Sequence, residues 1–324
     1  ETVIYSAFLT EHFGRAFELL ADIVFHSTFP QREIEKETEV IIDEIQSYED
    51  TPSELIFDDF EDLIFRGHPL GRNILGNPEL LKTFHSEDAA AFTSRFYHPG
   101  NIVFFVWGNL YFKQIIRLAE KLLADVPAVT VDNRRTPPSL YTPEKLVVHK
   151  DTHQAHVMIG SRGYNAYDDK RTALYLLNNI LGGPGMNSRL NVSLRERRGL
   201  VYNVESNLTS YTDTGVFCTY FGCDPDDVDT CMRLVMKELK NLRDTKMTSL
   251  QLAAAKKQLI GQIGVASDNN ENNALGMAKT FLHYNKYESS EAVYQRIEQI
   301  TPEILLEVAN EMFAEDYLST LIYR

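Results

Sequence analysis

Two glutamates in an amphipathic segment are the first residues of this chain that could do chemistry. Glu37 and Glu44 lie seven positions apart within Glu33–Pro52. Two helical turns separate them, so both carboxylates project from the same helix face. One carboxylate could bind a metal while the other holds it or a neighbouring ligand in place. Most glutamate pairs at this spacing belong to an ordinary solvated helix face, so the pair alone is weak evidence for a metal site.

Composition limits the classes of protein to consider. The chain has 324 residues, of which 44% are hydrophobic, enough for one large domain or two ordinary ones. A formal net charge of −14 argues against nucleic acid or an anionic membrane surface as the main partner. No apolar run is long enough to cross a membrane. We expect a cytoplasmic location, with the periplasm as the alternative. The cysteines, which form no C-x-x-C pair, are expected to be free thiols: Cys218, Cys223 and Cys231.

The order of elements repeats along the chain. Residues 86–109 indicate a helix capped by Ser86, a turn and a strand at 102–109. The same order recurs at 301–324, with Thr301 as the cap and a constant offset of 215 residues. A predicted strand at 2–9 and the helix after it likewise match 215–222 and the helix after that. Several matches in one order predict a duplicated architecture of the α+β class.

The repeat divides the chain into a first half at 1–130, a proline-rich linker at 131–143 and a second half at 144–324. The second half opens with a strand, two helices and a strand, the second helix at 187–197. This segment has no counterpart in the first half. We therefore expect a chain truncated at its N-terminus by about 71 residues, the offset of 215 less the start at 144. Truncation would expose a sheet edge and an apolar surface for another chain to cover.

Four passages resemble the M16 family of zinc metallopeptidases, which includes pitrilysin, insulinase and mitochondrial processing peptidase, in its short bacterial branch. The resemblance implies two homologous halves, each of helices packed on a mostly antiparallel sheet, that close like a clamshell over a peptide. The passages are Glu33–Pro52, Gly67–Gly76, Phe96–Asn109 and Leu181–Ser206.

The resemblance also implies a zinc site, made by H-x-x-E-H on one helix and a glutamate on a later helix. By its motif the later glutamate corresponds to Glu44, and Glu37 to the supporting carboxylate. Neither H-x-x-E-H nor H-E-x-x-H occurs in the 324 residues. The repeat assigns the histidine helix to the segment expected before residue 1, as the counterpart of the predicted helix at 172–183.

The histidines of this chain offer no replacement. His153 and His156 are three apart in a predicted strand or the turn before it, where they would face opposite sides. His68 and His98 each precede a proline and are expected in turns.

Arg195 and Tyr202 form a second pair, again seven residues apart. In the family an arginine and a tyrosine at this spacing contact the substrate backbone near the zinc and stabilise the developing oxyanion. A guanidinium and a phenol are suitable donors for this role. Without the resemblance, a surface arginine at a helix end and a packed tyrosine would be the favoured interpretation of the pair. Pro184-Gly185 is an apparent insertion into the family's glycine loop.

The resemblance thus predicts a zinc-dependent endopeptidase that encloses peptides and binds them partly by strand addition. This chain is expected to be inactive alone and to bind zinc weakly at best, because one carboxylate is not a metal site. The alternative is a non-catalytic M16 subunit for binding or assembly. The expected partners are a peptide substrate and either a second copy or another M16 chain, with no nucleic acid and no membrane.

Overall fold

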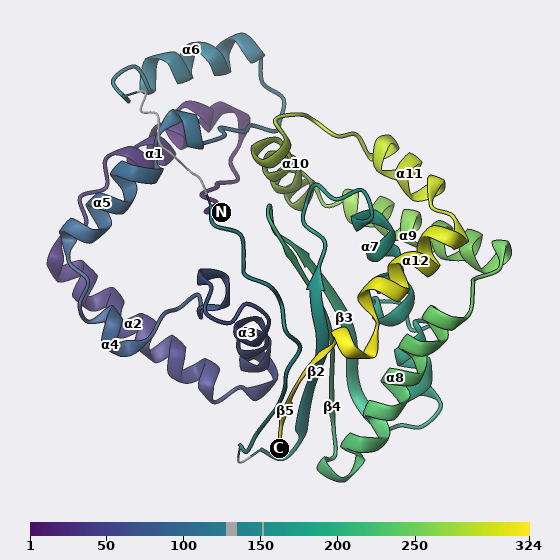
Figure 1. The fold of residues 1–324 in the computed structure, drawn as a ribbon. Coiled ribbons are helices and arrows are strands. Elements are labelled where there is room, and N and C mark those ends of the chain that lie inside the picture. The colour runs from purple at the N-terminus through teal and green to yellow at the C-terminus, as the bar shows by residue number, and fades with distance from the viewer. Residues whose placement is uncertain (128–134, 151) are drawn as a thin grey trace. The chain divides into compact units, whose positions relative to one another are not determined.

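The computed structural model describes residues 1–127, 135–150 and 152–324 (Figure 1). These residues contain many helices and one mixed sheet, which confirms the predicted α+β class. They form two compact units. The first contains 1–43, 77–135 and 269–287, and the second contains 44–76, 136–268 and 288–324.

The two compact units are defined by contacts between residues in space, whereas the predicted halves at 1–130 and 144–324 are defined by the repeat in the sequence. Residues 44–76 of the predicted first half belong to the same unit as most of the second half. The division by homology therefore stays a prediction. Of the predicted linker, 131–134 lie outside the described residues, and 135–143 have no regular secondary structure.

A five-stranded sheet in the second unit has the order β1-β5-β2-β4-β3. Only β1 and β5 are parallel; the other neighbours are antiparallel. The two central strands β2 and β4, together with β5, are almost wholly buried, as their continuous apolar runs require. The strands are β1 Lys145–Val148, β2 Ala155–Gly163, β3 Val201–Ser210, β4 Gly215–Cys223 and β5 Ser319–Tyr323.

Helices cover both faces of this sheet (Figure 1). On one face, α3 (Pro52–Ile64) places Ile56, Phe60 and Ile64 at four-residue spacing against Met158 and Tyr323. The larger core lies on the other face and is shared by five helices. These are α7 Arg171–Gly182, α8 Val228–Asp244, α9 Ser249–Ser267, α11 Ser290–Gln299 and α12 Pro302–Met312.

The first unit is helical, with a small cluster of Phe13, Phe17 and Ala21. The ring of Phe17 stacks on Phe104 at 4.1 Å between centroids. Helix α2 (Gln31–Glu49) begins in this unit and ends in the second. The other helices are α1 Phe13–Phe25, α4 Pro78–Leu81, α5 Ser86–Phe96, α6 Phe112–Leu122 and α10 Asn270–Tyr284.

The prediction of strands at 2–9 and 102–109 is wrong. Neither segment is hydrogen-bonded into a sheet among the described residues. An apolar β-pattern favours extended backbone, but a strand also needs a neighbour that completes the ladder. Large apolar side chains of both segments stay exposed, among them Tyr5, Leu9 and Trp107.

Two further local predictions are corrected. Helix α5 begins at Ser86 itself, whose hydroxyl donates to the Phe29 carbonyl at 2.7 Å, so Ser86 is not the N-cap. The helix predicted at 187–197 is a short π-helix, Asn191–Glu196. By contrast, Thr301 caps α12 as expected, its hydroxyl accepting from the Ile304 amide at 3.3 Å. None of the helices in the described ranges is long and apolar enough to cross a membrane.

Candidate functional site

A β-bulge at the start of β3 orients the first functional side chains. Val201 pairs with Cys223 and Val204 with Phe221, so Tyr202 and Asn203 together lie opposite one residue of β4, Gly222. Both valines are buried in the larger core, whereas Tyr202 and Asn203 are exposed. The extra residue therefore turns two consecutive side chains away from that core, as bulges beside functional sites often do.

Arg195 approaches Tyr202 from the π-helix that precedes β3. Its guanidinium carbon lies 5.8 Å from the centre of the Tyr202 ring, a distance that permits a cation–π contact. The turn between them closes through a hydrogen bond from the Gly199 amide to the Arg195 carbonyl, 2.8 Å long. Gly199 has φ +63°, a conformation that favours glycine. The structure thus brings together the two residues that the sequence paired.

A polar hollow of about 460 Å³ opens beside this pair. It lies on the α3 side of the sheet, and its lining comes from the start of α3, from β2 and β4, from the bulge and from the π-helix. Apart from glycine, every lining side chain ends in a polar group. The lining residues are Ser53, Gln154, His156, Arg195, Tyr202, Asn203, Tyr220 and Gly222.

A buried imidazole–phenol pair lies at one side of the hollow. His156 and Tyr220 are 8% and 5% exposed, and the imidazole Nδ1 lies 2.8 Å from the phenol oxygen. Burial raises the pKa of Tyr220 to about 12 and lowers the pKa of His156. At neutral pH both groups are therefore uncharged, and the hydrogen bond joins a neutral phenol to a neutral imidazole.

The predicted metal residues do not form a complete site. Glu37 and Glu44 both lie on α2, and both side chains are exposed. Within the described ranges, no group of three or more His, Cys, Asp or Glu residues is arranged to hold a metal ion. Zinc needs about four ligands, so the residues present do not fit it, and Glu44 could supply only one ligand.

Three of the other histidines considered above lie in turns. His153 lies in the turn before β2. His68 precedes the short helix Pro69–Gly71, and its Nδ1 accepts from the Leu70 amide at 3.2 Å. His98 precedes the short helix Pro99–Asn101. These positions confirm the expected turn roles of His68 and His98.

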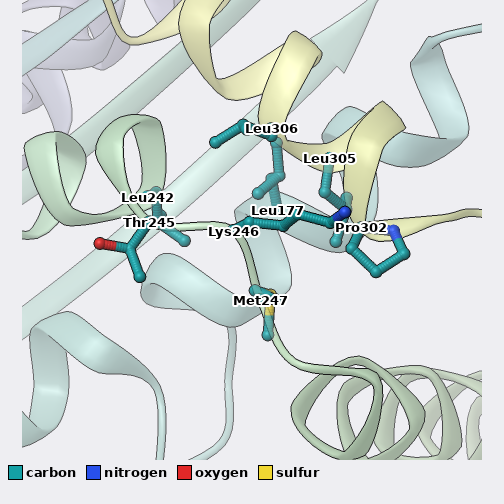
Figure 2. Close-up of a pocket in the computed structure, with 8 residues that line it drawn as sticks. All are labelled: Leu177, Leu242, Thr245, Lys246, Met247, Pro302, Leu305 and Leu306. Atoms are coloured by element: carbon teal, nitrogen blue, oxygen red, sulfur yellow. The ribbon is translucent and has the colours of Figure 1, made fainter.

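A second depression, between α7, the end of α8 and the start of α12, is apolar (Figure 2). Figure 2 shows Leu177, Leu242 and Leu305 lining it, with Lys246 and Met247 on the loop after α8. It has no room for a water-sized molecule. It is a gap in core packing and not a binding site.

Sequence reasoning missed most of the hollow. His156 was considered only as a metal ligand, and Tyr220, Asn203 and Gly222 were not considered. One signal was present: the buried valines at 201 and 204 are three apart in a strand that should alternate in steps of two. That spacing indicates a bulge, and with it two neighbouring outward side chains.

Comparison with known proteins agrees with the fold and the motifs. The family model described as Insulinase (Peptidase family M16) matches residues 1–78, and the one described as Peptidase M16 inactive domain matches residues 83–259. The uncharacterized zinc protease YmxG of Bacillus subtilis is similar, with 31% identity over 321 residues, which are 99% of this chain and 78% of the relative.

Solved structures share the fold at lower identity. A peptidase M16 inactive domain from Pseudomonas fluorescens has a TM-score of 0.89 and 20% identity, over 97% of this chain and 75% of that one. A chain of complex III2 from Candida albicans has a TM-score of 0.84 and 17% identity, over 97% and 77%. This chain belongs to peptidase family M16.

Proposed function

We propose that this chain forms the peptide-binding part of a zinc endopeptidase. The observation that carries the proposal is the contact between Arg195 and Tyr202 at the rim of a polar hollow. Both side chains are exposed, Tyr202 to 84%. Their N–H and O–H groups are therefore available to a ligand rather than used inside the protein.

The pair suits a carbonyl oxygen that gains negative charge when a peptide bond is attacked. The guanidinium and the phenol would each donate a hydrogen bond to that oxygen, more strongly as its charge develops. Arg195 makes no ion pair with a carboxylate among the described residues. Its positive charge is therefore not neutralised by an acidic neighbour before a substrate arrives.

An extended peptide could reach this pair by adding to the sheet. Strand β3 is an edge strand in the observed order, so one row of its backbone groups has no strand beside it within the described ranges. The bulge that exposes Tyr202 lies on the same strand. Peptide backbone bound along β3 would therefore pass close to the arginine–tyrosine pair.

Glu44 is proposed as one zinc ligand and Glu37 as the carboxylate that supports it. The other ligands, and the base that activates water, would have to come from outside these 324 residues. By itself the chain is therefore proposed to bind peptides without hydrolysing them. A second copy or another M16 chain is proposed as its partner.

The second candidate function is a non-catalytic binding or assembly subunit. The fold also occurs in a chain of complex III2 from Candida albicans. This candidate needs the hollow but gives no role to Glu44.

The test uses the polypeptide encoded by the complete gene, assayed for hydrolysis of an unfolded peptide. Arg195→Ala and Tyr202→Phe should each lower kcat/KM by about 100-fold, the usual effect of losing one oxyanion donor. Arg197→Ala, an exposed arginine two residues from Arg195, is the matched control. Zinc content should be the same in all variants. Equal losses in Arg195→Ala and Arg197→Ala, or no hydrolysis by the wild type, would contradict the proposed function.

A further inference from the structure

We propose that the hollow beside Arg195 and Tyr202 recognises a carboxylate group of a peptide, from an acidic side chain or a free C-terminus. The inference rests on the proposed function in one respect, that the ligand is a peptide. It does not need zinc or hydrolysis. It assigns a role to His156, Asn203, Tyr220 and Gly222, which the oxyanion pair does not use.

The pairing of β2 with β4 brings together the residues that form the floor of this site. His156 on β2 pairs directly with Gly222 on β4, and Tyr220 lies two residues before Gly222. All three therefore face the same side of the sheet. A Cβ atom at Gly222 would lie 3.3 Å from the Tyr220 hydroxyl, 3.5 Å from Gln154 Oε1 and 3.7 Å from His156 Nδ1. The missing side chain leaves these polar atoms uncovered.

His156 has one ring nitrogen left for a ligand. Its Nδ1 is engaged by the Tyr220 hydroxyl at 2.8 Å. Its Nε2 has no hydrogen-bond partner among the described residues, and it is not sealed from solvent. When the phenol donates to Nδ1, the neutral imidazole carries its proton on Nε2. Tyr220 thus positions an N–H donor in a hollow that already holds several others.

The charge of the lining selects an anion. Arg195 is the one formally charged side chain among the described residues that line the hollow, and none of them is Asp or Glu. Asn203, Tyr202 and Ser53 add neutral donors. A carboxylate accepts up to four hydrogen bonds, two of them from a single guanidinium. A cationic or apolar group would leave these donors unpaired.

Arg195 can serve the carboxylate and the carbonyl oxygen at once. Its guanidinium has five N–H donors spread around one plane. One edge can face a peptide carbonyl beside Tyr202 while the other faces the hollow. The carboxylate would then fix where along β3 the bound peptide lies, and hence which of its peptide bonds meets the oxyanion pair.

The test measures binding of labelled nine-residue peptides to the 324-residue chain by fluorescence anisotropy. The first peptide has no acidic residue and a free C-terminus, and the second is the same peptide amidated. The third and fourth are amidated and carry Glu or Gln at the centre. Circular dichroism checks that each protein variant is folded.

At least one carboxylate peptide should bind about tenfold more tightly than its neutral counterpart, as expected for one charge-assisted hydrogen-bond pair. The first pair of peptides reports a C-terminal carboxylate, and the second pair reports an acidic side chain. Gly222→Ala, which partly fills the floor, and His156→Phe should each remove this preference. His153→Ala, at an exposed turn position outside the hollow, is the matched control.

Equal affinities within both pairs, no binding of any peptide, or a preference that survives in Gly222→Ala and His156→Phe would overturn the inference. No binding of any peptide would contradict the proposed peptide binding as well, whereas equal affinities or a surviving preference would overturn this inference alone. A complete protein without zinc or hydrolysis can still prefer a carboxylate, and an active one can still lack that preference.

Discussion

Burial of an acidic side chain on α3 should make the stability of the folded protein depend on pH. The carboxylate of Glu61 accepts a hydrogen bond from Tyr211, with 2.8 Å between the oxygens. Burial nevertheless raises the pKa of Glu61, and repulsion from Asp58 adds to the rise, while the Tyr211 bond opposes it. The charged form of Glu61 is therefore less stable in the folded protein than in water.

Glu61→Gln should stabilise the protein at neutral and higher pH. Because its folded pKa is raised, Glu61 holds its proton longer when folded, so stability falls as pH rises through the ordinary glutamate pKa and above it. Glutamine never ionises and still offers Tyr211 an acceptor, so the gain in stability should be present at pH 8 and vanish below the ordinary glutamate pKa, at about pH 4. Urea unfolding at both pH values measures this, with Glu54→Gln on the exposed face of α3 as control. Destabilisation by Glu61→Gln at pH 8 would contradict the expectation.

Sequence motifs predicted that some residues of the site lie close together but missed others. Arg195 and Tyr202 are linked by a short local turn, so a sequence motif was enough to pair them. His156 and Tyr220 are 64 positions apart and meet only through the register of β2 and β4. No local pattern in either segment fixes that register, which depends on the whole sheet.

Helix α7 approaches β3 closely enough to require a glycine at the end of the helix. A Cβ atom at Gly182 would lie 2.7 Å from Ser206 Cβ and 2.8 Å from the Ser206 amide nitrogen. Asn178, one turn earlier, donates to the Ser206 carbonyl at 2.9 Å and so fixes the helix against the strand. An added methyl group at Gly182 cannot be relieved by rotating a flexible side chain, because the atoms it meets belong to the strand itself.

Two glycine-to-alanine substitutions should therefore have opposite effects. Gly182→Ala should destabilise by about 1–3 kcal/mol, the usual cost of overpacking. Gly261→Ala on α9, where nothing lies within 4 Å of the new Cβ atom, should stabilise by about 0.5–1 kcal/mol through helix propensity. Urea unfolding followed by circular dichroism compares the stability of the two variants with that of the unchanged protein. Shifts of the same sign would contradict the close contact between α7 and β3.

Strand predictions were correct only where another segment of the chain pairs with the predicted strand. The apolar patterns at 155–163, 215–223 and 319–323 all became buried strands of one sheet. The similar patterns at 2–9 and 102–109 became extended segments. Both sets have the residue types that favour strands, so composition did not separate them. The difference is the presence of a pairing strand, which lies far away in sequence.

For the whole molecule, the motifs were sufficient to predict family M16 and the α+β class. The functional assignment depends on how much of the site lies in this chain. The hollow, the bulge and the arginine–tyrosine pair all belong to the second compact unit. Of the proposed metal residues, Glu44 could supply one zinc ligand and Glu37 could support it, and both side chains are exposed. Peptide binding, proposed for this chain, is therefore separate from zinc-dependent hydrolysis, which needs further ligands.

Zinc content per polypeptide, measured by atomic absorption after dialysis, tests this separation most directly. The 324-residue chain should retain no stoichiometric zinc. The polypeptide from the complete gene should retain about one zinc, and Glu44→Gln should weaken that binding by tenfold or more, as loss of a ligand requires. Glu39→Gln, an exposed position on the same helix, is the control and should keep the zinc. One tightly held zinc in the 324-residue chain, or unchanged zinc binding in Glu44→Gln, would contradict the account.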